Sequence, residues 1–234
     1  MLTGHFGVSY ALKAKEKQAS LGLLFLAVGF ADLIWSLFIL FGVERAQLAP
    51  TLQSSRLNLY YMPFDHSLTG ILFWSIVIYL LFLVLPVPQG ARKSRIALAM
   101  ALAVFSHFVL DIPVHRADLG LIGNAYKIGL GLYNYPIPAF LLEAITLLAG
   151  LWLYLRSTTG STFLGKYGMI FLYVFLLLIN AFTYWGPNPQ NVQEVAVFLP
   201  IVYFVSALLA DWLDGKRRPK EGSVAAPVQS ATQT

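Results

Sequence analysis

The segment around residues 107–115 carries ionisable side chains inside an apolar stretch. His107, Asp111 and His115 follow one another at intervals of four residues, a spacing that stacks side chains on one face of a helix. A charged side chain near the centre of a bilayer costs about 3 kcal/mol, so such residues usually face a cavity, a partner or a metal. Neutral imidazoles with carboxylates suit zinc, and also iron or manganese when carboxylates dominate. The segment is therefore a candidate metal site.

Ionisable residues of other segments fall at the same depth as His107. At about 1.5 Å per helical residue, Asp32, His107 and Glu143 lie roughly 18 to 20 Å above the nearest polar turn or basic collar. His5 reaches this layer if the N-terminal residues form a short helix and the polar turn at 15–20 reverses the chain, which brings His5 opposite Asp32. Several segments therefore aim polar groups at one layer.

Composition places these residues in a membrane protein. The chain has 234 residues, of which 58% are hydrophobic and 12% charged, and its mean hydropathy is +0.68. Such a chain lacks most of a solvated surface and is polytopic. It has no cysteine, so a metal must be held by nitrogen and oxygen. The net charge of +5 comes from short basic collars between apolar runs, where the expected partners are anionic membrane lipids and not nucleic acid.

The expected fold is all-α, a transmembrane helix bundle of about six spans preceded by an N-terminal half-helix. A bilayer core of about 30 Å needs roughly 20 apolar residues per helix. Six runs meet this length, at 20–42, 67–86, 95–114, 136–155, 164–185 and 194–213. They predict a single domain over 1–214. The segment 215–234 is too polar to fold and is expected to be a disordered tail.

Basic residues collect on one side of these spans. Lys and Arg are concentrated in 13–17, 92–95, 156–166 and 216–220, whereas the opposite loops hold only four of them. By the positive-inside rule, the N-terminal turn and the C-terminus are cytoplasmic. The expected location is the plasma (inner) membrane.

A metal in this layer would supply hydrolytic chemistry. Held by three or four protein ligands, it keeps a position for water and lowers the pKa of that water toward neutrality. Glu143 and Asp65 are the candidate catalytic residues, with Glu143 as base or proton shuttle. An aspartate before an apolar run is also a common helix cap, which leaves a second interpretation of Asp65. His115, Arg116 and Lys127, near the outer mouth, are the candidate substrate-binding residues.

A segment of small and aromatic residues follows this mouth. Gly129, Gly131 and the stretch 133–136 predict a shaped segment whose aromatic side chains rest at headgroup level. A lid over a site in the outer leaflet favours a lipid or amphiphilic substrate that enters sideways from the membrane.

Four short motifs carry a family resemblance. They are Gly4-His5-Phe6-Gly7, Ala31-Asp32-Leu33, Asp65-His66-Ser67-Leu68 and Ser106-His107-Phe108-Val109-Leu110-Asp111. Over roughly residues 1–115 the chain resembles the YdjM-like inner-membrane proteins, a family of predicted metal-dependent hydrolases. The chain departs from that family where Phe30-Ala31 replaces a proline and where Asp65 replaces a threonine. The resemblance implies a ligand role for His5, Asp32, His66, His107 and Asp111.

The expected function is hydrolysis of an ester, a phosphoester of a lipid or amphiphile, with one or two divalent metals of which zinc comes first and manganese or iron next. A divalent cation or proton transporter would use the same His and Asp residues to bind its passenger. A non-catalytic scaffold would use the polar layer only to hold helix register. An enzyme needs a blind pocket, whereas a transporter needs access from both faces.

Overall fold

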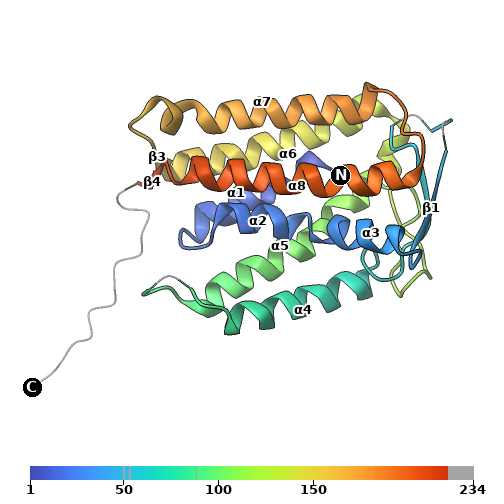
Figure 1. Cartoon of the computed structure of the whole chain (residues 1–234), viewed down its shortest axis with the longest axis horizontal. Helices are drawn as coiled ribbons and strands as arrows, with labels where there is room; N and C mark the ends of the chain where they lie inside the picture. Colours follow the sequence, from blue (N-terminus) through green and yellow to red (C-terminus); the bar gives the residue numbers. More distant parts are fainter. Residues whose placement is uncertain (50, 53, 88, 221–234) are drawn as a thin grey trace, which may run out of the picture.

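The computed structural model describes residues 1–49, 51–52, 54–87 and 89–220. Most of them lie in helices that form a bundle, as Figure 1 shows, which confirms the helical class. The helices are η1 (Thr3–His5), α1 (Phe6–Lys15), α2 (Leu21–Val28), α3 (Phe30–Leu40), α4 (Leu68–Val84), α5 (Lys93–Val114), η2 (Leu132–Asn134), α6 (Pro136–Ser157), α7 (Phe163–Trp185) and α8 (Val192–Asp214). The strands are β1 (Arg45–Leu48), β2 (Leu57–Tyr61), β3 (Thr158–Thr159) and β4 (Arg218–Pro219).

Four helices of the described chain are long and apolar enough to cross a membrane. They are α5, α6, α7 and α8, of 22 or 23 residues each. Helices α2 and α3 would add a fifth span together, but they meet at a bend of 52°. Helix α4 has only 17 residues, fewer than the roughly 20 that a bilayer core requires. These helices are consistent with an integral membrane protein, and the prediction of six spans is not confirmed.

The predicted span 20–42 is broken at Gly29. A Cβ atom on Gly29 would lie 2.1 Å from Cε1 of Tyr203, so only a glycine lets the Tyr203 ring pack at this point. Gly29 itself leaves the helical conformation, with φ −87° and ψ 4°. The break turns α3 away from α2 and places Asp32 in the first turn of the new helix.

The N-terminal segment forms the predicted half-helix. Helices α1 and α2 are joined by the turn 16–20, and α1 also packs against α6. The two backbones nearly touch: a Cβ atom on Gly150 would lie 1.9 Å from the carbonyl oxygen of Gly7, and one on Gly7 would lie 2.2 Å from that of Thr146. Glycine at both positions therefore holds η1 and His5 close to α6.

Basic segments meet at one end of the bundle. Lys13 forms an ion pair of 2.8 Å with Asp214 at the end of α8, and Arg95 pairs with Glu16 at 3.6 Å. Strands β3 and β4 pair there as well (Figure 1). Strand β4 lies inside the segment 215–234 for which disorder is predicted, so ordered structure extends beyond the predicted boundary. The remainder of that predicted tail, from 221 onward, lies outside the described residues.

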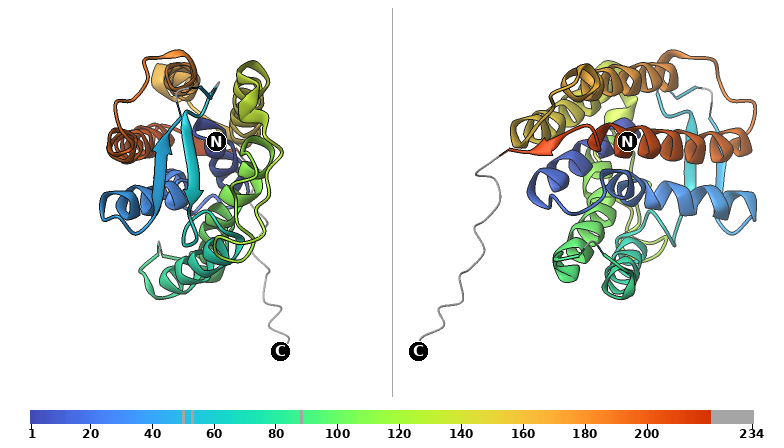
Figure 2. Two further views of the ribbon diagram at one scale, coloured as in Figure 1. Left: turned by 90° about the vertical axis from the view of Figure 1, so that its right-hand side faces the viewer. Right: turned by 60° about the vertical axis from the view of Figure 1, so that its left-hand side comes forward.

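The opposite end is covered by strands and loops. Strands β1 and β2 form an antiparallel hairpin, which crosses this end of the bundle in Figure 2. The loop between α5 and α6 returns onto α5, where the Gly131 N–H donates to the His115 carbonyl at 2.7 Å. Gly129 and Gly131 have φ values of +149° and +75°, which favour glycine. The loop therefore turns where the glycines stand, and its place over a mouth at headgroup level stays a prediction.

Candidate metal centre

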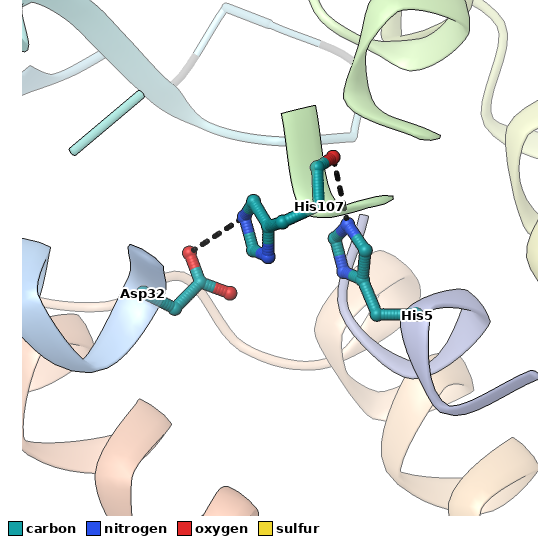
Figure 3. Close-up of side chains that lie close together, drawn as sticks. All are labelled: His5, Asp32 and His107. Carbon is teal, nitrogen blue, oxygen red and sulfur yellow. Dashed lines mark hydrogen bonds and ion pairs between the residues drawn. The ribbon is translucent and has the colours of Figure 1, made fainter. Parts of the chain in front are cut away.

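The five residues predicted as metal ligands lie together in the structure. His5 ends η1, Asp32 begins α3, His66 precedes α4, and His107 and Asp111 lie one turn apart on α5. Each is at most 9% exposed. Figure 3 shows His5, Asp32 and His107 approaching one another from three elements. Residues far apart in the sequence therefore form one buried cluster.

Ligand atoms of this cluster form two triangles that share an edge. His66 Nε2 and His107 Nε2 lie 3.3 Å apart. Asp111 Oδ2 closes one triangle, at 4.0 Å from His66 Nε2 and 3.2 Å from His107 Nε2. Asp32 Oδ1 closes the other, at 3.3 Å and 3.8 Å from the same atoms. Ligands about 2.0 to 2.1 Å from a tetrahedral zinc ion lie about 3.3 to 3.4 Å from one another, so both triangles have suitable dimensions for a metal site.

Hydrogen bonds on the far side of each ring determine which nitrogen faces the cluster. His107 Nδ1 lies 2.7 Å from the carbonyl oxygen of Val28. A carbonyl only accepts, so Nδ1 carries the hydrogen. His66 Nδ1 lies 2.6 Å from Asp65 Oδ1 in the same way. Each neutral ring then directs the lone pair of Nε2 into the cluster, as metal-ligating histidines do when they donate the other N–H to a carbonyl or carboxylate.

The lone pairs of His66 Nε2 and His107 Nε2 repel each other unless a metal cation or a proton lies between them. Burial lowers the pKa of His66, but the carboxylates of Asp65 and Asp32 raise it more strongly, so that it stands well above 6.5. A proton therefore occupies the place in the absence of metal. Because a metal ligand must be an unprotonated imidazole, metal binding here would release that proton.

His5 joins the cluster from above the His107 ring. The two rings are stacked, with centroids 3.9 Å apart and planes 7° from parallel. His5 Nε2 lies 3.3 Å from Asp111 Oδ1 and 3.4 Å from the His107 carbonyl oxygen. Its Nδ1 is buried and has no hydrogen-bond partner among the described residues. Buried polar atoms rarely lack a partner, so His5 brings an unsatisfied nitrogen to the edge of the cluster.

The two carboxylates are held by donors outside the histidine set. Asp32 Oδ2 accepts a hydrogen bond of 2.6 Å from the Tyr203 hydroxyl on α8. Asp111 Oδ1 forms an ion pair with the amino group of Met1. Each carboxylate therefore presents its other oxygen to His66 and His107, in a fixed orientation.

Asp65, predicted as a catalytic residue, lies behind His66. Its Oδ1 accepts from His66 Nδ1, whereas its Oδ2, like Oε2 of the neighbouring buried Glu44, has no hydrogen-bond partner among the described residues. Glu44 also accepts from the backbone N–H of Phe64, at 2.8 Å. Burial, together with the negative charge of Asp65, raises the pKa of Glu44 to about 9. Glu44 thus carries a proton at neutral pH and can donate it to Asp65. Asp65 in turn is placed to orient His66, a predicted metal ligand.

Glu143, the other predicted catalytic residue, lines the cavity beside the cluster. Its Oε1 accepts from the Tyr184 hydroxyl at 3.0 Å. Its Oε2 accepts from the backbone N–H groups of Leu2 at 2.9 Å and Gly4 at 3.1 Å. These contacts attach the N-terminal segment to α6 and thereby hold His5 in place. The role of Glu143 as a base stays a prediction.

His115, predicted to bind substrate, also lines the cavity. Its Nε2 lies 3.4 Å from Asp111 Oδ2, and its Nδ1 lies 2.9 Å from Asp118 Oδ1. Although Pro113 lies between them in α5, His115 stays beside Asp111. It repeats the arrangement of His66 and His107, with an anchored Nδ1 and an Nε2 that faces the carboxylate.

Arg116 and Lys127 are not among the described residues that line the cavity. Arg116 donates to the side chain of Asn134 at 2.8 Å and to two loop carbonyl oxygens at 3.1 and 3.4 Å. Lys127 Nζ donates to the carbonyl oxygen of Tyr60 at 2.8 Å. Both join loops at this end of the bundle to other segments, and neither reaches the lining of the cavity in the described chain.

A cavity of about 470 Å³ lies beside the cluster. Its lining combines members of the cluster with apolar side chains of α3, α7 and α8. The lining includes Asp32, His66, Asp111, His115 and Glu143 on the polar side and Trp35, Phe182, Val195, Phe198 and Leu199 on the apolar side. Arg56 supplies a cation in the wall, where it donates to Gly186 and Asn188.

Two residues of the site have no counterpart in the sequence prediction. Tyr203 looks like any other aromatic residue of an apolar span, and only packing on Gly29 brings its hydroxyl to Asp32. Arg56 is one of the four basic residues that lie outside the basic collars of the sequence. The scarcity of basic residues there draws attention to Arg56, but the sequence alone does not distinguish Arg56 from Arg116.

Comparisons of the chain with protein-family models, curated proteins and solved structures found no match. The likeness to the YdjM-like proteins therefore stays a prediction that four short motifs carry.

Proposed function

We propose that the protein is a membrane-embedded, metal-dependent hydrolase that cleaves an ester, with a phosphoester of a lipid or amphiphile as its substrate class. One observation carries the proposal. His66 Nε2 and His107 Nε2 face each other across 3.3 Å beside buried carboxylates, while each Nδ1 is anchored elsewhere. A carboxylate oxygen of Asp32 and one of Asp111 thus lie within 4.0 Å of both imidazole nitrogens, which is a donor set that a metal ion would share.

The donor set fits a divalent transition metal. His66, His107 and Asp111 would hold it, and Asp32 lies within reach of the same two nitrogens. Two imidazoles with a carboxylate are the ligands of many catalytic zinc sites, and manganese or iron would come next. When bound, such a metal lowers the pKa of a coordinated water and polarises the ester.

Other residues of the cavity would act on the substrate. The guanidinium of Arg56 would bind an anionic group of the ester through charged hydrogen bonds. His115, whose ring is held by Asp118, would exchange a proton at its Nε2 with water or the leaving group. Glu143 is the second group in the cavity lining that is able to accept a proton.

The proposal includes an orientation in the plasma (inner) membrane. The basic end of the bundle, with the α1–α2 turn and the C-terminal part of α8, would face the cytoplasm. Asp111 lies in the last turn of α5, far from the basic start of that helix. The cluster and its cavity would then lie in the outer half of the bilayer.

Elemental analysis tests the metal centre. Protein purified in detergent without added metal or chelator should contain zinc, manganese or iron, and a His107→Ala/Asp111→Ala variant should lose it. Ser106→Ala is the matched control, because Ser106 stands on the same helix and, among the described residues, its hydroxyl donates to the carbonyl of its own helix at Ala103. Equal metal content in the native and double-variant proteins would overturn the site.

Hydrolysis is tested separately, by incubating the metal-loaded protein with phosphatidic acid and other phosphoester lipids. Release of phosphate or of a headgroup that requires His107 is the expected result. Bound metal without hydrolysis, together with uptake of that metal into sealed vesicles, would support transport and contradict the enzyme.

A further inference from the structure

Two phenylalanines separate the cavity from the outside of the bundle. Phe182 of α7 and Phe198 of α8 both line the cavity. Their rings contact each other across the two helices, with centroids 6.5 Å apart and planes at 44°. Phe182 is also 54% exposed. The same side chain therefore reaches the cavity on one side and the surface of the bundle on the other.

This pair lies at a depth where lipid chains would surround the bundle. Phe182 is three residues from the end of α7 at Trp185, and Phe198 is six from the start of α8 at Val192. At about 1.5 Å per residue, the pair lies roughly 5 to 9 Å below the helix ends. Trp185 is exposed, as aromatic residues at a membrane interface are. The level of the two rings is thus the hydrocarbon just beneath the headgroups.

The cavity behind the rings is suited to an amphiphile. Val195 and Leu199 continue its apolar lining from Phe198 along α8, and Trp35 adds to it from α3. The polar lining consists of the histidines and carboxylates of the cluster, with Arg56 as a cation. A molecule with a hydrocarbon chain and an anionic polar group matches both kinds of lining.

We propose that Phe182 and Phe198 form a lateral gate through which one hydrocarbon chain of an anionic membrane amphiphile enters the cavity from the surrounding leaflet. This inference rests on the proposed function in one respect, namely that the metal centre would cleave the polar group of the molecule whose chain has entered. Entry of the chain depends only on the seam between α7 and α8. A water-soluble ester would instead enter through the outer loops and would need no gate.

Trp35 provides a probe for the chain inside the cavity. It lines the cavity and is 2% exposed, so lipids around the bundle do not touch it. Replacement of the other four tryptophans by phenylalanine leaves Trp35 as the only indole of the chain. The variant is placed in bilayers of phosphatidylcholine and phosphatidic acid, with the acyl chains of the phosphatidic acid brominated near their middle. Bromine quenches indole fluorescence only near contact, so at least a twofold loss of Trp35 emission is expected relative to unbrominated lipid.

Closing the gate should abolish this quenching. The chain has no cysteine, so Phe182→Cys and Phe198→Cys can be bridged specifically with a short bifunctional, reducible thiol reagent. Bridging should restore the unquenched emission, and reduction should return the quenching, which also shows that the fold is intact. Phe182→Cys alone with the same reagent is the control, because a single thiol cannot bridge the helices.

Two outcomes would overturn the gate. One is an unquenched Trp35 in brominated lipid together with quenching by acrylamide, which would show a cavity that opens to water. The other is quenching that persists after bridging, which would place the entrance elsewhere. The assay needs no metal or turnover. Metal analysis of the same samples therefore distinguishes failure of the gate from failure of the metal centre.

Discussion

His107 on α5 is tied to the break between α2 and α3 by a hydrogen bond of 2.7 Å from its Nδ1 to the carbonyl oxygen of Val28. The next residue, Gly29, makes room for the Tyr203 ring, and the Tyr203 hydroxyl holds Asp32 at 2.6 Å. One bend in the backbone therefore positions a ligand ring and a carboxylate at the same time.

Gly29→Ala should damage both the fold and the site. The new Cβ would lie 2.1 Å from Tyr203, and relief of such overpacking costs about 1 to 3 kcal/mol. We expect a lower unfolding temperature in detergent and a reduced metal content. Gly215→Ala is the control, because the nearest atom to its Cβ would be at 3.4 Å. Equal losses in the two variants would argue against a special role for the bend.

Asp65→Asn should weaken metal binding although no ligand is removed. The aspartate orients His66 through a bond of 2.6 Å to Nδ1, and loss of such outer partners typically costs about 10- to 100-fold in affinity. Competition with a chromophoric chelator would measure the dissociation constant. Asp118→Asn, which removes the partner of His115, should change it far less, because His115 belongs to neither ligand group of the described chain. A larger effect at Asp118 would move the metal toward His115.

Metal affinity should fall as the pH is lowered. The carboxylates of Asp65 and Asp32 outweigh burial and raise the pKa of His66 well above 6.5, so at neutral pH a metal must displace a proton from this ring. The apparent affinity should drop about tenfold for each pH unit if one proton is released. Chelator competition between pH 6.5 and 8.5 would give the slope, and an affinity independent of pH would exclude His66 as a ligand.

Glu44→Gln should stabilise the protein at alkaline pH. The pKa of Glu44 is raised from 4.5 to about 9 by burial and by Asp65. Between these values the folded state holds a proton that the unfolded state has lost, so stability declines as the pH rises through this window. A glutamine cannot lose that proton and can still donate to Asp65. Melting curves should therefore coincide near pH 4.5 and show a more stable variant at pH 8.5, and equal stability of the two proteins at pH 8.5 would contradict a protonated Glu44.

The sequence predicts the meeting of His5 and Asp32 because both lie at countable distances from one polar turn. It predicts the stacking of His107 and Asp111 for a similar reason, since a helix of known period carries both. The break at Gly29 could not be foreseen, because its cause is the ring of Tyr203, which is distant in the sequence. The same limit applies to the prediction that Arg116 and Lys127 bind substrate. Their charge and approximate depth suggest a substrate-binding site, but only the loop geometry shows that both side chains donate to backbone carbonyl oxygens.

The close approach of Gly7 to Gly150 also sets an order of events during synthesis. Gly4, beside His5, is made 139 residues before Glu143, the acid on α6 that holds its N–H group. Until α6 has been made, the N-terminal segment lacks the carboxylate that accepts from the backbone N–H groups of Leu2 and Gly4. A ribosome-bound chain would therefore carry all five predicted ligands before His5 is held in its final position. Completion of the cluster would wait for the second half of the protein.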